Sequence, residues 1–168
     1  MTADDIIALL RLEPHPKEGG FFREIYRASE SIAPDNLADR YGNQARSQAT
    51  AIFYLLTPDT FSHIHTVASD ETFHFYLGDP VEMLQLHPGD HGEKVVLGSN
   101  ILDGEKVTTT VPHGVWQGCK LRDGGAFALM GCTVTPGFEY QDYAHGERSY
   151  LIEHYPNFTD DIIALTDE

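Results

Sequence analysis

The feature that most constrains this chain is a close succession of short, strand-like segments between residues 50 and 135. Turn signals such as Gly78-Asp79-Pro80 and Asp123-Gly124-Gly125 separate the segments. Many short strands at close spacing, with no helices between them, indicate an antiparallel sandwich or barrel and not a parallel α/β sheet. We therefore predict an all-β fold with strands at 21–27, 50–56, 71–77, 81–87, 94–97, 107–111, 115–121 and 126–135.

Helical patterns occur only near the two ends of the chain. Thr2 is a good N-cap for an apolar stripe that should end before Pro14. A short helix is expected over 146–155, and Thr159 opens another segment of the same design as the first. Residues 29–44 are polar and weakly patterned, which predicts a long loop or a mobile cover.

Length and charge narrow the class of protein. A chain of 168 residues without a linker or a composition break predicts a single domain over 1–168. The net charge of -15 repels phosphate backbones and disfavours nucleic-acid binding. No apolar run approaches the roughly 20 residues of a membrane helix, and the N-terminus is acidic where a secretory signal would be basic. We expect a cytoplasmic protein with neither nucleic-acid nor membrane partners.

Histidines are frequent, and two of them stand one residue apart in Phe61-Ser62-His63-Ile64-His65. On an extended strand this spacing places both imidazoles on the same face. Two nitrogen ligands on one face, with Glu71 offering a carboxylate oxygen nearby, suit a divalent metal ion. The plainer interpretation is a pair of ordinary polar strand residues, because His-x-His is common by chance.

The surrounding sequence resembles the cupin family. His63-Ile64-His65, then Glu71, then Gly78 is similar to the first cupin motif, and 112–117 (Pro-His-Gly-Val-Trp-Gln) is similar to the second. The strings Pro-His-Pro-x-Glu-Gly-Gly at 14–20, His-Phe-Tyr-Leu-Gly-Asp-Pro at 74–80 and Gly-Val-Trp-Gln-Gly at 114–118 resemble a subgroup of small, mostly uncharacterised cupins. The resemblance implies a jelly-roll barrel, also called a double-stranded β-helix, with short terminal helices. It also implies a homodimer.

Gln117 stands where metal-binding cupins have their third histidine. An amide oxygen is a weak ligand for a transition metal, whereas an imidazole is a strong one. The cofactor prediction is therefore open between no cofactor and a weakly held divalent metal on His63, His65 and Glu71.

Strand alternation predicts the remaining pocket. Phe73 and Phe75 share the face of Glu71, and Gln117 shares a face with Cys119. Either Tyr54 or Phe53 should also point inward, and a bulge would bring in His74. The predicted ligand-binding residues are thus Gln117, Phe73, Phe75, Tyr54, Cys119 and His74.

Three functions fit these residues. The first is a metal-independent isomerase, epimerase or lyase of sugar or small-metabolite chemistry, with Glu71 as general base and His63 or His65 as its partner. The second is a small-molecule-binding or sensory cupin without turnover. The third is a metal-dependent oxygenase that uses His63, His65 and Glu71.

Overall fold

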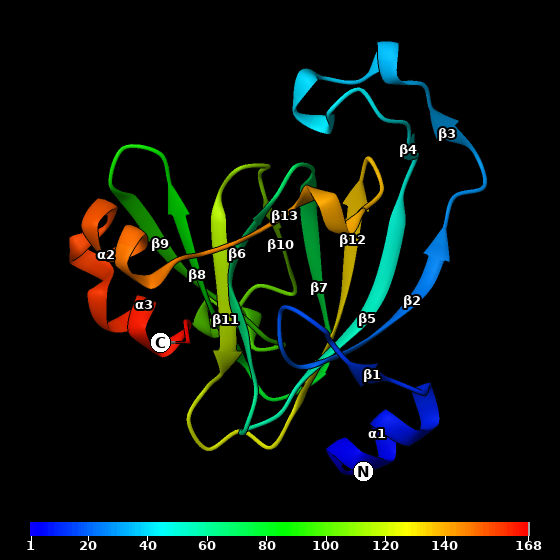
Figure 1. The fold of residues 1–168 in the computed structure, drawn as a ribbon. Coiled ribbons are helices and arrows are strands. Elements are labelled where there is room, and N and C mark those ends of the chain that lie inside the picture. The colour runs from blue at the N-terminus through cyan, green and yellow to red at the C-terminus, as the bar shows by residue number, and fades with distance from the viewer. Residues whose placement is uncertain (168) are drawn as a thin grey trace.

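The computed structural model describes residues 1–167, and most of its strands form two facing antiparallel sheets that close a barrel (Figure 1). The six-stranded sheet runs β1 (Glu13–Pro14), β2 (Phe21–Arg27), β5 (Thr50–Leu56), β12 (Ala128–Thr135), β7 (Asp70–Gly78) and β10 (Thr108–Val111). The five-stranded sheet runs β13 (Tyr143–His145), β6 (Phe61–Val67), β11 (Trp116–Leu121), β8 (Val81–His87) and β9 (His91–Leu97). The predicted all-β jelly-roll class is confirmed.

Side chains from both sheets fill one half of the barrel. In the six-stranded sheet Met130 of β12 pairs with Tyr54 of β5, and both are fully buried. Met83 and Leu97 meet them from the five-stranded sheet within the same apolar cluster. The apolar cluster fills one end of the barrel, and polar side chains can therefore occupy the other end.

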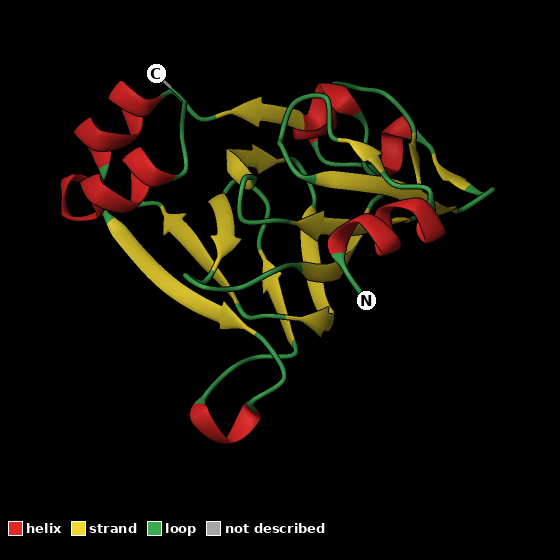
Figure 2. Ribbon diagram, turned by 90° about the horizontal axis from the view of Figure 1, so that it is seen from below, coloured by secondary structure: helices red, strands yellow, loops and turns green. Residues whose placement is uncertain are grey.

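Short helices cover the outside of the barrel. α1 (Ala3–Leu10) begins at the predicted N-cap Thr2, whose hydroxyl accepts the amide N–H of Asp5. α2 (Arg148–His154) and α3 (Thr159–Ala164) pack over the outer face of the five-stranded sheet, where Leu151 and Ile162 are fully buried (Figure 2). None of the helices in the described residues has the length and apolar character needed to cross a bilayer.

The polar segment between β2 and β5 is more ordered than a plain loop. It holds the two-stranded ladder of β3 (Ser31–Ile32) and β4 (Arg46–Ser47) and two short 3₁₀ turns, 34–36 and 39–41. The segment projects beyond the open end of the barrel (Figure 1). Its buried anchor is Arg46, whose guanidinium reaches the segment between β12 and β13.

Candidate functional site

A cavity of about 230 Å³ lies at the end of the barrel that the apolar core leaves open. Both sheets contribute to its wall, together with the loop between β1 and β2 and the segment between β12 and β13. Its apolar lining is Phe22, Ile52, Val67, Cys132, Val134 and Phe138. Its titratable lining is His15, Glu18, His65, Glu71, Tyr140 and Tyr143, with Glu24, Arg27 and Glu139 also on the wall.

The loop between β1 and β2 inserts Glu18 into this cavity. The next residue, Gly19, has φ +93°, and a Cβ there would lie 2.4 Å from the carbonyl oxygen of Phe61. The Ser62 hydroxyl donates to Glu18 Oε1 at 2.6 Å, and the amide of His63 donates to the Glu18 carbonyl at 2.8 Å. The loop can therefore approach β6 this closely because residue 19 has no side chain.

Two imidazoles flank the free oxygen of Glu18. His15 Nε2 lies 3.8 Å from Glu18 Oε2, and His65 Nε2 lies 3.9 Å from the same atom. Burial lowers the pKa of His15 below its usual value, and Glu18 opposes that effect. His15 is therefore mainly neutral at pH 7.

Backbone contacts fix the tautomers of both rings. His15 Nδ1 accepts the amide N–H of Glu18 at 2.9 Å, so the neutral ring carries its hydrogen on Nε2. His65 Nδ1 lies 2.7 Å from the carbonyl oxygen of His63, which can only accept, so this nitrogen carries the hydrogen. Neutral His65 consequently presents the lone pair of Nε2 toward Glu18.

His63 and His65 do not share a face, so the expectation that they do is wrong. Gln117 of β11 pairs with His65 of β6, and Cys119 pairs with Ser62. Two residues of β6, His63 and Ile64, therefore lie opposite the single residue Gly118 of β11. Such a β-bulge shifts the alternation of side chains by one residue. His63 therefore stacks on His145 at 3.6 Å and accepts the amide N–H of Asp167 at 3.0 Å, away from the cavity.

Glu71 is the most perturbed carboxyl of the site. Its side chain comes from the start of β7, is 8% exposed, and accepts the Gln117 amide N–H at 2.6 Å. Burial raises its pKa from 4.5 to about 7, helped by the negative charge of Glu18 and opposed by His65 and the Gln117 hydrogen bond. Near neutral pH this carboxyl can both accept and release a proton.

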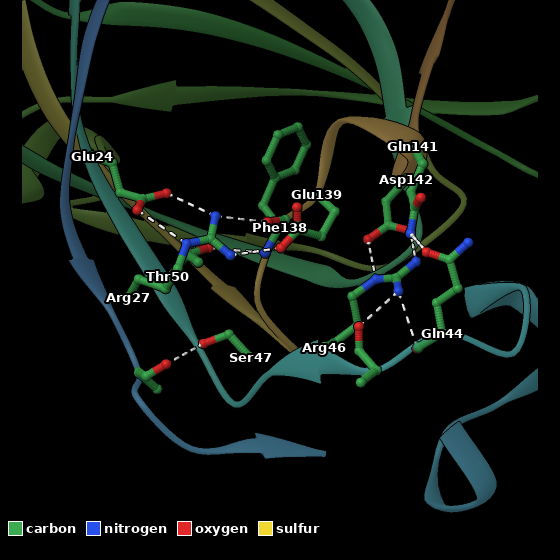
Figure 3. Close-up of polar contacts among 12 residues, drawn as sticks. Glu24, Arg27, Gln44, Arg46, Ser47, Thr50, Phe138, Glu139, Gln141 and Asp142 are labelled. Carbon is green, nitrogen blue, oxygen red and sulfur yellow. Dashed lines mark hydrogen bonds and ion pairs between the residues drawn. The ribbon is translucent and has the colours of Figure 1, made fainter. Parts of the chain in front are cut away.

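Ion pairs hold the rim of the cavity (Figure 3). Arg27 donates to both oxygens of Glu24, to Glu139 at 2.7 Å and to the carbonyl of Phe138. Arg46 of β4 forms a buried bidentate pair with Asp142, at distances of 2.6 and 2.8 Å (Figure 3). Asp142 lies in the segment between β12 and β13.

Only His65 and Glu71, of the site residues predicted from sequence, line the cavity. Tyr54, Phe73 and Cys119 do point into the barrel, but they are buried in the apolar core together with the partly buried Phe75. His74 points to the opposite face of β7, where Nε2 contacts the hydroxyl of Thr133 at 3.2 Å. Gln117 touches the cavity indirectly, through Glu71.

The residues do not fit the metal site that the sequence motif suggests. His63 is turned away by the bulge, and Gln117 uses its amide nitrogen on Glu71. Across residues 1–167, no three His, Cys, Asp or Glu side chains are grouped so that they could hold a metal ion. His63, His65 and Glu71 are thus not assembled as a ligand set.

Sequence reasoning missed His15 and Glu18, and it missed the aromatic wall of Phe138, Tyr140 and Tyr143. The signal for the first two was the string Pro-His-Pro-x-Glu-Gly-Gly, in which both glycines have positive φ. Paired positive-φ glycines mark a tight loop, and a polar residue just before them is a candidate for insertion. The aromatic segment carried no comparable local signal.

Comparison with known proteins agrees with this architecture. Residues 4–146 match the family described as Cupin superfamily (DUF985). The chain belongs to this cupin family. A hypothetical protein from Leishmania major is 31% identical to this cupin, with all of both chains covered and a TM-score of 0.88. A protein from Shewanella oneidensis is 29% identical over 99% of this chain and 98% of its own, with a TM-score of 0.87.

Two further matches are more distant. An uncharacterized protein from Saccharomyces cerevisiae is 26% identical over 76% of this cupin and 67% of its own length. Oxalate decarboxylase from Bacillus subtilis is 12% identical, with a TM-score of 0.54 over 92% of this cupin and 37% of the larger chain. At that distance the shared feature is the barrel, and the chemistry of this cupin has to be argued from its own cavity.

Proposed function

We propose that this cupin is an enzyme of small-molecule metabolism that transfers a proton on a substrate held in the cavity. The observation that carries the proposal is the placement of Glu71 and His65 on the wall of one cavity. One is a carboxyl whose pKa is about 7, and the other presents an imidazole lone pair. Acid–base groups of this kind are most effective when their pKa lies near the working pH.

Glu71 is the general base of the proposed reaction. In its ionised form it takes a proton from the substrate, and the Gln117 amide N–H stabilises the carboxylate before transfer. In an isomerisation Glu71 exchanges the abstracted proton with solvent and returns a solvent-derived proton to a second atom of the substrate, so no other co-reactant is consumed. His65 Nε2 accepts a hydrogen bond from a substrate hydroxyl or amine and orients it.

The buried thiol of Cys132 has no part in this chemistry. Burial raises the pKa of Cys132 well above its usual value, and the charge of Glu71 adds to that effect. A protonated thiol is a poor nucleophile. The aromatic and aliphatic wall instead supplies the apolar contact area that most small-molecule sites use for affinity.

Proton transfer can be tested without knowing the substrate. The protein is incubated with a pool of small metabolites in deuterated water, and mass spectrometry records compounds that gain deuterium at carbon. Glu71→Gln should lower the exchange rate by about a hundredfold or more, because a positioned base contributes on the order of 10² to 10⁴ in rate. Glu153→Gln removes an exposed carboxyl of α2 and should leave the rate unchanged.

Two outcomes would count against the proposal. Exchange at equal rates in the protein and in Glu71→Gln would remove Glu71 from the mechanism. Binding of a metabolite with no deuterium gain would indicate a cupin that binds its ligand without turnover.

A further inference from the structure

The charge of the cavity wall selects among substrates. Four glutamates line it, Glu18, Glu24, Glu71 and Glu139, against one guanidinium, that of Arg27. Because Arg27 already donates to Glu24, to Glu139 and to a backbone carbonyl, its charge is compensated within the rim (Figure 3). A carboxylate or phosphate entering this cavity would meet like charges, because the described lining holds no lysine and its single arginine is already compensated.

One carboxylate oxygen on the wall, Oε2 of Glu18, has no hydrogen-bond donor within reach among the described residues. His15 Nε2 and His65 Nε2 lie 3.8 and 3.9 Å from it, too far for a hydrogen bond. Independently, Gln117 is 2% exposed, and its Oε1 has no hydrogen-bond partner among the described residues. A ligand ammonium group, with its several N–H donors, would donate to this open oxygen of Glu18.

The aromatic wall favours the same kind of group. Phe138, Tyr140 and Tyr143 line the same cavity as Glu18. From outside the cavity, the ammonium of Lys17 already lies 5.4 Å from the ring centroid of Tyr140 and 5.6 Å from that of Tyr143. Ring faces of this kind attract cations through their quadrupoles.

We infer that the natural ligand of the cavity is a small organic amine, bound as its ammonium ion at Oε2 of Glu18, beside the stacked rings of His65 and Tyr143. The volume of about 230 Å³ limits the ligand to a compact molecule with an apolar body. The inference rests on the proposed ligand site and adds its substrate class. It argues against anionic substrates such as sugar nucleotides and dicarboxylates.

Three probes with one common body test the inference: benzylamine, benzyl alcohol and benzoate. At about pH 7.5 they are a cation, a neutral molecule and an anion. Dissociation constants from ligand-observed NMR titration should place benzylamine about tenfold or more tighter than benzyl alcohol, with benzoate weakest. Glu18→Gln should abolish the preference for benzylamine and change benzyl alcohol affinity by less than about twofold.

Glu13→Gln is the matched control, because it removes an exposed carboxyl of β1, the strand that precedes the same loop. It should leave all three affinities unchanged. Benzoate binding as tightly as benzylamine, or no benzylamine binding at millimolar concentration, would overturn the inference. The order of the three probes on the unaltered protein decides the matter even where Glu18→Gln does not fold.

This result is separate from the test of proton transfer. Deuterium exchange that depends on Glu71 can be found while benzoate is preferred, and then only the substrate class is wrong. A preference for benzylamine without any deuterium exchange would keep the ligand class and remove the catalytic role.

Discussion

Glu71→Gln isolates the free energy that this protein spends on burying a carboxyl beside Glu18. The variant keeps the size and the hydrogen-bonding shape of the side chain but cannot ionise. The pKa of Glu71 is about 7 in the folded protein, against an ordinary value of 4.5. Between these pH values the folded chain keeps a proton that the unfolded chain has lost.

The sign of the pH effect follows from that difference in bound protons. Stability falls with pH wherever the folded state binds more protons than the unfolded state. The contribution of Glu71 is therefore full below pH 4.5, is lost as the pH rises, and is gone above about pH 7. A rise in pKa from 4.5 to about 7 corresponds to about 3 kcal/mol, at about 1.4 kcal/mol for each tenfold change in proton affinity.

The measurement is the free energy of unfolding in urea, from about pH 4.5 to about pH 8 at constant ionic strength. Trp116 is the single tryptophan and packs against the buried cluster under α2 and α3, so its fluorescence reports unfolding. We expect the stability of the protein minus that of Glu71→Gln to fall by about 3 kcal/mol across this range. Titrating groups that do not interact with Glu71 cancel in the difference, which therefore reports Glu71 together with its neighbours Glu18 and His65.

The exposed control Glu153→Gln should track the unaltered protein at every pH. A difference curve that is flat or that rises with pH would refute the reasoning, since Glu71 would then be as easily ionised in the fold as in water. A smaller fall that is complete well below pH 7 would mean that solvent reaches the carboxyl and that its pKa is raised less.

The remaining predictions concern the loop and the rim that shape the cavity. Gly19→Ala should destabilise the fold by at least about 2 kcal/mol in urea unfolding, because residue 19 has φ +93° and its Cβ would lie 2.4 Å from the Phe61 carbonyl oxygen. Gly42→Ala, at φ +62° but with open space around its Cβ, should cost clearly less. Arg46→Met should lower the free energy of unfolding by about 3 to 5 kcal/mol, since it leaves the carboxylate of Asp142 buried and unpaired. Adding Asp142→Leu to Arg46→Met should recover most of that loss, and no recovery would show that the guanidinium matters through its backbone contacts.

Local sequence was a good guide to the elements of the barrel. The strand predicted at 81–87 is β8 as observed, and the one at 50–56 is β5. Others, such as β9 and β12, differ by a few residues at one end. Strand alternation and turn residues are local properties, so they can be read from the chain before any long-range contact is known.

The cavity depended on contacts between distant parts of the chain. Glu18 enters it through hydrogen bonds to Ser62 and His63, and Tyr140 and Tyr143 close it from a segment far along the sequence. No local pattern contains such pairings, because each is set by how loops pack on a barrel already formed.

His63, His65 and Glu71 illustrate the difference between what the sequence determines and what the tertiary structure determines. By itself the sequence determined that these residues belong to a cupin barrel, and that Glu71 begins the next strand. The tertiary structure decided that His65 alone joins Glu71 at the cavity, because the extra residue opposite Gly118 shifts the alternation of β6 and turns His63 outward. A bulge is a property of the pairing between two strands, and so it appears only when both strands are in place.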